Sequence, residues 1–243
     1  MFSSVAITIM LAMMPQPGHA GSAPGIEIGR FSSASEGIAL PIGWRPLTFP
    51  KIPRHTRYEL VKDGDTTVVR ATSEAAASGL VREMTIDLRE YPILQWRWKV
   101  LNVITKGDVR TKQGDDYAAR IYITFEYDSE KVDFSTKMKY KIGRLLFGDL
   151  PIAAINYIWE NMTPEGTIVE SAYTDRSKMI VVESGRDHVG QWIEEERNVY
   201  EDYKKAFGRE PPLVNGVAIM TDTDNTGEAA IAYYGDIVFK SGQ

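Results

Sequence analysis

The chain has 243 residues, carries a formal net charge of −5 and contains no cysteine. The missing thiols exclude disulfide bonds, thiolate zinc sites and a cysteine nucleophile. The negative charge argues against a nucleic-acid partner, because nucleic-acid phosphates require a basic surface.

The N-terminal segment predicts an export signal over residues 1–20. Its uncharged apolar run from Val5 to Met14 is shorter than the roughly 20 residues that cross a bilayer, but it has the length of a signal-peptide core. Gly18-His19-Ala20 supplies the small residues of a cleavage site. We therefore expect a periplasmic or secreted protein, with residues 21–243 as a single domain and no later segment that spans a membrane.

Several short segments of the remaining chain alternate apolar and polar residues with period two, which is the pattern of half-buried β-strands. In Leu94–Val100, for example, Trp96 and Trp98 share one face and Arg97 lies on the other. The predicted strands are Thr66–Ala71, Leu80–Leu88, Leu94–Val100, Tyr117–Tyr127, Lys178–Glu183, Val214–Thr221 and Ala230–Phe239.

Two segments predict helices. Lys137–Phe147 is basic and then apolar, and Gln191–Phe207 has acidic residues near its start and lysines near its end, as the helix dipole favours. The stretch Asn156–Asn161 is expected either as a loop that reaches over a binding groove or as a plug at an edge. Many strands with few helices predict a mostly-β, two-sheet sandwich with one or two inserted helices, and a jelly roll is the expected topology.

One polar sheet face is the predicted ligand site. If the last strand shares a sheet with Leu94–Val100 and Tyr117–Tyr127, its outer face combines guanidinium, phenol and carboxylate groups, which hydrogen-bond polyols, with aromatic rings that stack on sugars. A solvated face with weakly paired charges remains the alternative. The predicted ligand-binding residues are Arg97, Arg120, Tyr122, Asn156, Trp159, Tyr234 and Asp236.

An Asp-rich turn precedes the last strand and is a candidate calcium site. Asp222, Asp224 and Asn225 concentrate the oxygen ligands that hard cations require. The same residue types are also typical of an ordinary hairpin turn, so both interpretations stay open.

Asp116 is a candidate catalytic carboxylate, with Glu126 or Asp236 as its partner. Paired carboxylates of a glycosidase lie about 5–10 Å apart, and the sequence alone does not provide this distance. Adjacent aspartates such as Asp115 and Asp116 also form turns at the start of strands.

Several motifs in order resemble the bacterial domain-of-unknown-function family 3047. They extend over roughly Phe31 to Phe239, and this resemblance implies no activity. The motifs are Gly43-Trp44-Arg45-Pro46, Leu94-Gln95-Trp96-Arg97-Trp98, Gly114-Asp115-Asp116-Tyr117-Ala118-Ala119-Arg120, Asn156-Tyr157-Ile158-Trp159, Asp222-Thr223-Asp224-Asn225-Thr226 and Tyr233-Tyr234-Gly235-Asp236-Ile237.

The Trp-containing strand and the closing strand are also similar, more loosely, to galactose-binding-like jelly rolls, which include many carbohydrate-binding modules. The segment Lys137–Asn161 departs from such compact modules. Three hypotheses follow: an exported protein that binds a carbohydrate or another polar envelope ligand, a glycoside hydrolase or polysaccharide lyase, and a non-catalytic envelope interaction protein.

Overall fold

A computed structural model describes residues 25–37, 40–126 and 153–242. The expected export signal at residues 1–20 and the expected helix Lys137–Phe147 lie outside the described residues. Within the described part of the chain, no helix combines the length and apolar character needed to cross a membrane.

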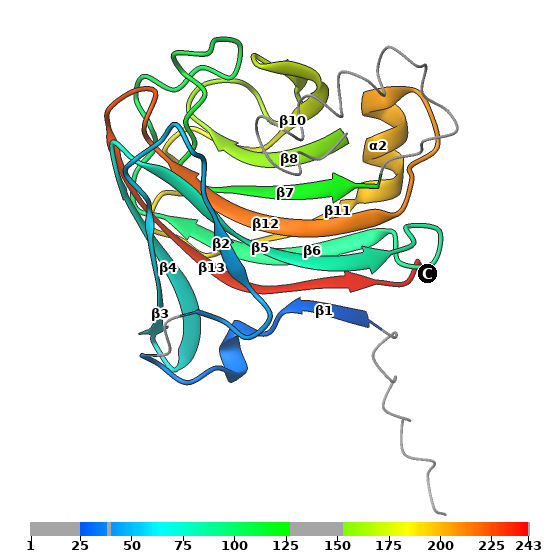
Figure 1. Cartoon of the computed structure of the whole chain (residues 1–243), viewed down its shortest axis with the longest axis horizontal. Helices are drawn as coiled ribbons and strands as arrows, with labels where there is room; N and C mark the ends of the chain where they lie inside the picture. The colour runs from blue at the N-terminus through cyan, green and yellow to red at the C-terminus, as the bar shows by residue number, and fades with distance from the viewer. Residues whose placement is uncertain (1–24, 38–39, 127–152, 243) are drawn as a thin grey trace, which may run out of the picture.

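The fold is a mostly-β sandwich of two sheets, as the sequence predicts (Figure 1). Sheet A has the strand order β11-β6-β13-β4-β3, and β1 also pairs with β13. Its strands are β1 (Gly25–Gly29), β3 (Arg57–Asp63), β4 (Thr66–Glu74), β6 (Ile93–Val100), β11 (Ile193–Asn198) and β13 (Ala229–Lys240).

Sheet B has the strand order β2-β5-β12-β7-β8-β10-β9. All of its pairs are antiparallel except β8 with β10, which run parallel. Its strands are β2 (Arg45–Leu47), β5 (Ala77–Ile86), β7 (Arg120–Phe125), β8 (Ala153–Glu160), β9 (Ile168–Ser171), β10 (Thr174–Ser184) and β12 (Val214–Asp222).

Aromatic side chains from both sheets meet in the core. Trp96 of β6 lies with its ring 5.2 Å from that of Tyr157 on β8, and Trp98 lies 6.0 Å from Trp159. The two sheets therefore share one hydrophobic core, and the alternation in β6 correctly assigns the tryptophans to its inner face.

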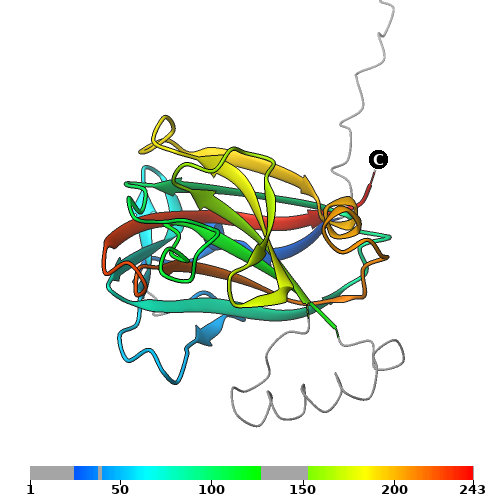
Figure 2. The same ribbon diagram turned by 90° about the horizontal axis from the view of Figure 1, so that it is seen from above.

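The predicted helix Gln191–Phe207 is only half correct. Ile193–Asn198 forms β11, and the α-helix α2 begins at Val199 and ends at Phe207. The side chain of Asn198 accepts a hydrogen bond from the backbone N–H of Glu201, and Gly208 ends the helix with a φ of 68°. Figures 1 and 2 show α2 at one end of the sandwich, where the ring of Tyr203 packs 4.5 Å from that of Phe125 at the end of β7.

The end of the sandwich away from α2 is formed by loops, and we call it the loop end. It includes the segment 101–119 before β7, the segment 161–167 after β8, and the turn 223–228 that joins β12 to β13 (Figure 1). A short 3-10 helix, η1 (Phe31–Ser33), follows β1.

Candidate functional site

The predicted single ligand face does not form. Arg97 on β6 and Asp236 on β13 belong to sheet A, whereas Arg120 and Tyr122 on β7 belong to sheet B. The expectation that these strands share one sheet is wrong, because period-two patterns define the faces of a strand but do not specify its partners.

Three of the predicted ligand residues are core residues. Tyr234 and Asn156 are fully buried and Trp159 is 2% exposed. The hydroxyl group of Tyr234 donates to the carbonyl oxygen of Met220 at 2.6 Å, the side-chain amide of Asn156 donates to Ser177, and the indole of Trp159 donates to the carbonyl of Gly185. Their polar atoms connect strands and loops inside the protein, so they do not face a ligand as expected.

The predicted catalytic pair of Asp116 with Glu126 is not brought together. Asp116 precedes β7 and Glu126 follows it, and a strand of this length is about 20 Å long, well beyond the 5–10 Å of a glycosidase pair. Asp236 lies on sheet A, where Ser32 donates to its carboxylate through both its backbone N–H and its hydroxyl group.

The outer side of sheet A contains a polar groove of about 390 Å³. Three neighbouring strands form it, because Glu194 on β11 pairs with Arg97 on β6, and Val238 on β13 pairs with Gln95. This groove, called the sheet A groove below, is lined by Gln95, Trp96, Arg97, Glu194, Glu195, Glu196, Asp236 and Val238.

Arg97 is held flat at the groove. Its guanidinium carbon lies 4.7 Å from the ring centre of Trp192, and the indole N–H of Trp192 donates to Asp63. A guanidinium that stacks on an aromatic ring keeps its in-plane N–H groups for a ligand. Of the predicted ligand residues, Arg97 and Asp236 are therefore the two that the structure places together at a hollow in the surface.

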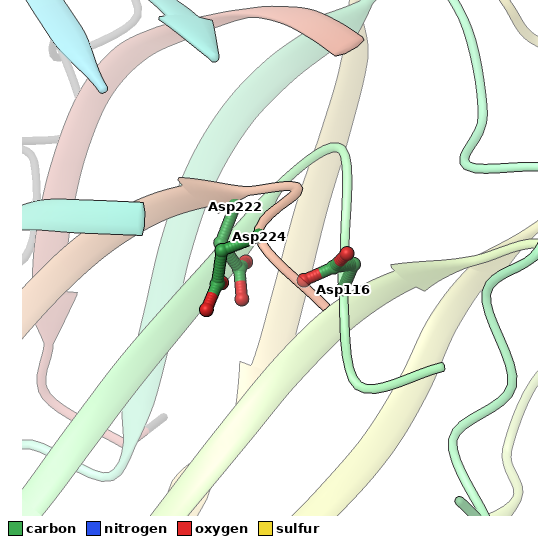
Figure 3. Close-up of side chains that lie close together, drawn as sticks. All are labelled: Asp116, Asp222 and Asp224. Carbon is green, nitrogen blue, oxygen red and sulfur yellow. The ribbon is translucent and has the colours of Figure 1, made fainter. Parts of the chain in front are cut away.

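A second polar site lies at the loop end. The carboxylates of Asp116, Asp222 and Asp224 offer oxygen atoms that all lie within 4.8 Å of one another, and we call these three residues the aspartate cluster. Figure 3 shows Asp222 and Asp224, at the end of β12 and in the following turn, opposite Asp116 from the loop before β7. These elements meet because β12 and β7 are antiparallel neighbours, with Met220 opposite Arg120.

Arg120 neutralises part of this charge. Its guanidinium donates to the Oδ2 atom of Asp222 at 2.5 Å, and both side chains are almost completely buried. Burial nevertheless raises the pKa of Asp222, against the opposing effect of Arg120, and it also raises the pKa of Asp115 and of Asp224.

The side chain of Asn225 also connects neighbouring loops. Its side-chain amide donates to the carbonyl oxygen of Lys112 and to the hydroxyl group of Tyr173, so it holds neighbouring loops together. Asp116 lies with Asp222 and Asp224 in the cluster, although the sequence did not assign it there. Sequence analysis missed this grouping because it depends on the pairing of β7 with β12.

The sequence also missed several groove residues. Glu194, Glu196 and the stacking partner Trp192 all fall in the first half of the predicted helix Gln191–Phe207, where they were not assigned to a sheet. The alternation from Ile193 to Asn198 was the available signal.

Comparison with known proteins places the chain in a family. The family model described as "Protein of unknown function (DUF3047)" matches residues 42–238. The chain belongs to this family. Among solved structures, this DUF3047 protein is similar to "Cellulose induced protein, Cip1", with 11% sequence identity and a TM-score of 0.33 over 80% of this chain and 90% of that chain. The search of curated proteins found no match.

Proposed function

We propose that the protein is an exported carbohydrate-binding protein whose ligand lies in the sheet A groove. The observation that supports this function is the convergence of Arg97, Asp236 and Glu194 on one hollow of about 390 Å³. This volume lies in the range of small-molecule sites, although the groove is more polar than most of them. A guanidinium only donates hydrogen bonds and a carboxylate only accepts them, whereas a sugar hydroxyl does both.

The charge of the groove disfavours an acidic sugar. Three carboxylates, those of Glu194, Glu196 and Asp236, surround the guanidinium of Arg97. An acidic glycan with uronate or phosphate groups meets like charges there, which opposes its binding. Asp236 keeps acceptor capacity for a ligand, because a carboxylate has about four lone-pair positions and Ser32 uses two of them.

The test is a binding screen of the purified protein against uncharged, acidic and amino-substituted oligosaccharides, followed by calorimetry on the best ligand. Arg97→Ala removes the donor and is expected to weaken binding at least tenfold, since a hydrogen bond to a charged group contributes about 1.5–3 kcal/mol. Arg89→Ala is the matched control, because Arg89 is an exposed arginine that pairs with Asp87 outside the groove.

Three outcomes would contradict the proposed function. The first is that no uncharged oligosaccharide binds, and the second is that only acidic or only cationic sugars do. The third is that Arg97→Ala and Arg89→Ala bind the ligand equally well.

Export is the second part of the proposal and is supported by the sequence of residues 1–20. The apolar run from Val5 to Met14 and the small residues around Ala20 predict cleavage before Gly21. N-terminal sequencing of the protein from a secreting bacterial host is expected to begin at Gly21. An intact Met1 on a protein that stays in the cytoplasm would contradict export.

A further inference from the structure

The aspartate cluster is a second site, separate from the sheet A groove, and its charge is not balanced by protein groups. Asp115 adds a fourth carboxylate and is 9% exposed, while Asp116 and Asp222 are each 2% exposed. One guanidinium, that of Arg120, lies buried among them. Burying unpaired carboxylates costs several kcal/mol for each ion, and this cost is relieved either by protonation, which the raised pKa values of Asp222, Asp115 and Asp224 favour, or by a bound cation.

One buried carboxylate oxygen of the cluster also lacks a hydrogen-bond donor within the part of the chain that the structure describes. Asp222 Oδ2 pairs with Arg120, but its Oδ1 is buried and has no hydrogen-bond partner among the described residues. A buried carboxylate oxygen without a donor is rare in folded proteins, because water no longer solvates it. The carboxylate of Asp222 lies close to those of Asp116 and Asp224 (Figure 3).

Backbone N–H groups of neighbouring loops hold part of the cluster in place. The backbone N–H groups of Asn225 and Thr226 donate to the two carboxylate oxygens of Asp116, the second at 2.6 Å. Glu228 accepts hydrogen bonds from the backbone of Thr105 and Lys106, which ties the turn after β12 to the loop after β6. The carboxylate of Asp116 is thus fixed beside the turn that carries Asp224.

We propose that Asp116, Asp222 and Asp224 bind a divalent cation, and that the ion is calcium. All three ligands are carboxylate oxygens, which hard cations prefer, and the cluster contains no histidine or thiolate that would favour zinc. Calcium tolerates irregular ligand geometry, whereas magnesium requires a nearly ideal octahedron. The ion joins the end of β12 in sheet B to the turn that leads into β13 in sheet A.

The experiment measures thermal unfolding of the chelated full-length protein during titration with calcium chloride, with parallel titrations of magnesium and zinc. A ligand that binds only the folded state raises its stability, so calcium at about one hundred times its Kd is expected to raise Tm by about 5–10 °C. Terbium luminescence, excited through the neighbouring Tyr117 and competed by calcium, reports binding without unfolding.

Asp224→Asn is the informative variant, because Asp224 is only half-buried and forms no ion pair with Arg120. It is expected to fold and to lose most of the calcium-induced rise in Tm. Asp65→Asn, in the exposed turn between β3 and β4, is the matched control and is expected to keep the full rise. Asp222→Asn is less suitable because it also breaks the buried pair with Arg120.

The proposal is overturned if calcium leaves Tm unchanged, or if Asp224→Asn and Asp65→Asn respond equally. A response to zinc but not to calcium would overturn the assignment of the ion. Because the groove and the cluster share no residue, loss of calcium binding in Asp224→Asn with unchanged sugar binding separates this site from the proposed function.

Discussion

A single carboxyl group between the two sheets is expected to make stability depend on pH. Glu195 on β11 points inward beside the indole of Trp98, and its Oε1 atom is buried without a hydrogen-bond partner among the described residues. Burial, and to a smaller extent the nearby Glu183 of β10, raises the pKa of Glu195 to about 8. The group is therefore protonated in the folded protein at neutral pH.

The raised pKa of Glu195 makes the protein less stable as the pH rises. An unfolded glutamate ionises near pH 4.3, so between this pH and about 8 the unfolded chain binds fewer protons than the folded protein. The free energy of unfolding contributed by Glu195 is present at acidic pH and is lost as the pH rises through 8. Glu195→Gln cannot ionise, and we expect its Tm to fall less than that of the wild type between pH 6 and pH 9.

Differential scanning calorimetry at both pH values measures this difference. Glu194→Gln, the exposed neighbour on the same strand, is the control and is expected to behave like the wild type. If all three proteins lose the same number of degrees, Glu195 does not titrate as described.

At the scale of elements, an irregularity in β13 determines which side chains reach the groove. The register between β13 and β6 shifts between Tyr234 and Ile237, so Gly235 and Asp236 both lie near Arg97. The sequence placed Tyr234 on the outer polar face, but Tyr234 is fully buried, while its neighbour Tyr233 is half-buried on the other side. One extra residue in the strand reverses the faces on either side of it.

The bulge gives a test of the groove that removes none of its polar groups. A Cβ atom at position 235 would lie 2.4 Å from Cγ of Arg97, much closer than the 3.5–4.0 Å of an ordinary carbon contact. Gly235→Ala therefore displaces Arg97, and we expect at least a tenfold loss of sugar affinity together with about 1–3 kcal/mol of stability. Calorimetric titration and urea unfolding measure the two effects.

The control is Gly242→Ala, whose Cβ would contact Pro92 at 3.4 Å near the end of the chain. It is expected to keep both affinity and stability. Unchanged affinity in Gly235→Ala would show that the position of Arg97 does not matter for the ligand.

The sequence predicted β4, β5, β6, β7, β10, β12 and β13 as strands, but it did not predict β8 or β11. All eight residues of β8 are buried, so it shows no alternation: Tyr157 and Trp159 pack in the main core, and Ile158 belongs to a second hydrophobic cluster. Three successive glutamates in β11 imitate the acidic start of a helix, although Ile193, Glu195 and Arg197 point inward with period two. The helix signals themselves were correct from Val199 onward.

At the scale of the whole molecule, the sandwich was predictable and the two candidate sites were only partly so. The residues of the aspartate cluster and of the groove are far apart in sequence, and each set is assembled by strand pairing: β7 with β12 for the cluster, and β11, β6 and β13 for the groove. Side-chain periodicity carries no information on these partners, which explains why Arg97 and Arg120 were expected on one face.

We expect an uncharged sugar to occupy the sheet A groove beside Arg97. The most direct measurement is a nuclear magnetic resonance titration that follows the side-chain N–H signals of Arg97 and Trp192 while the best uncharged oligosaccharide is added. Both signals are expected to shift saturably with the same Kd, while the indole signal of Trp44, which is buried outside the groove, stays in place. Saturable binding that leaves the Arg97 and Trp192 signals unmoved would contradict the claim.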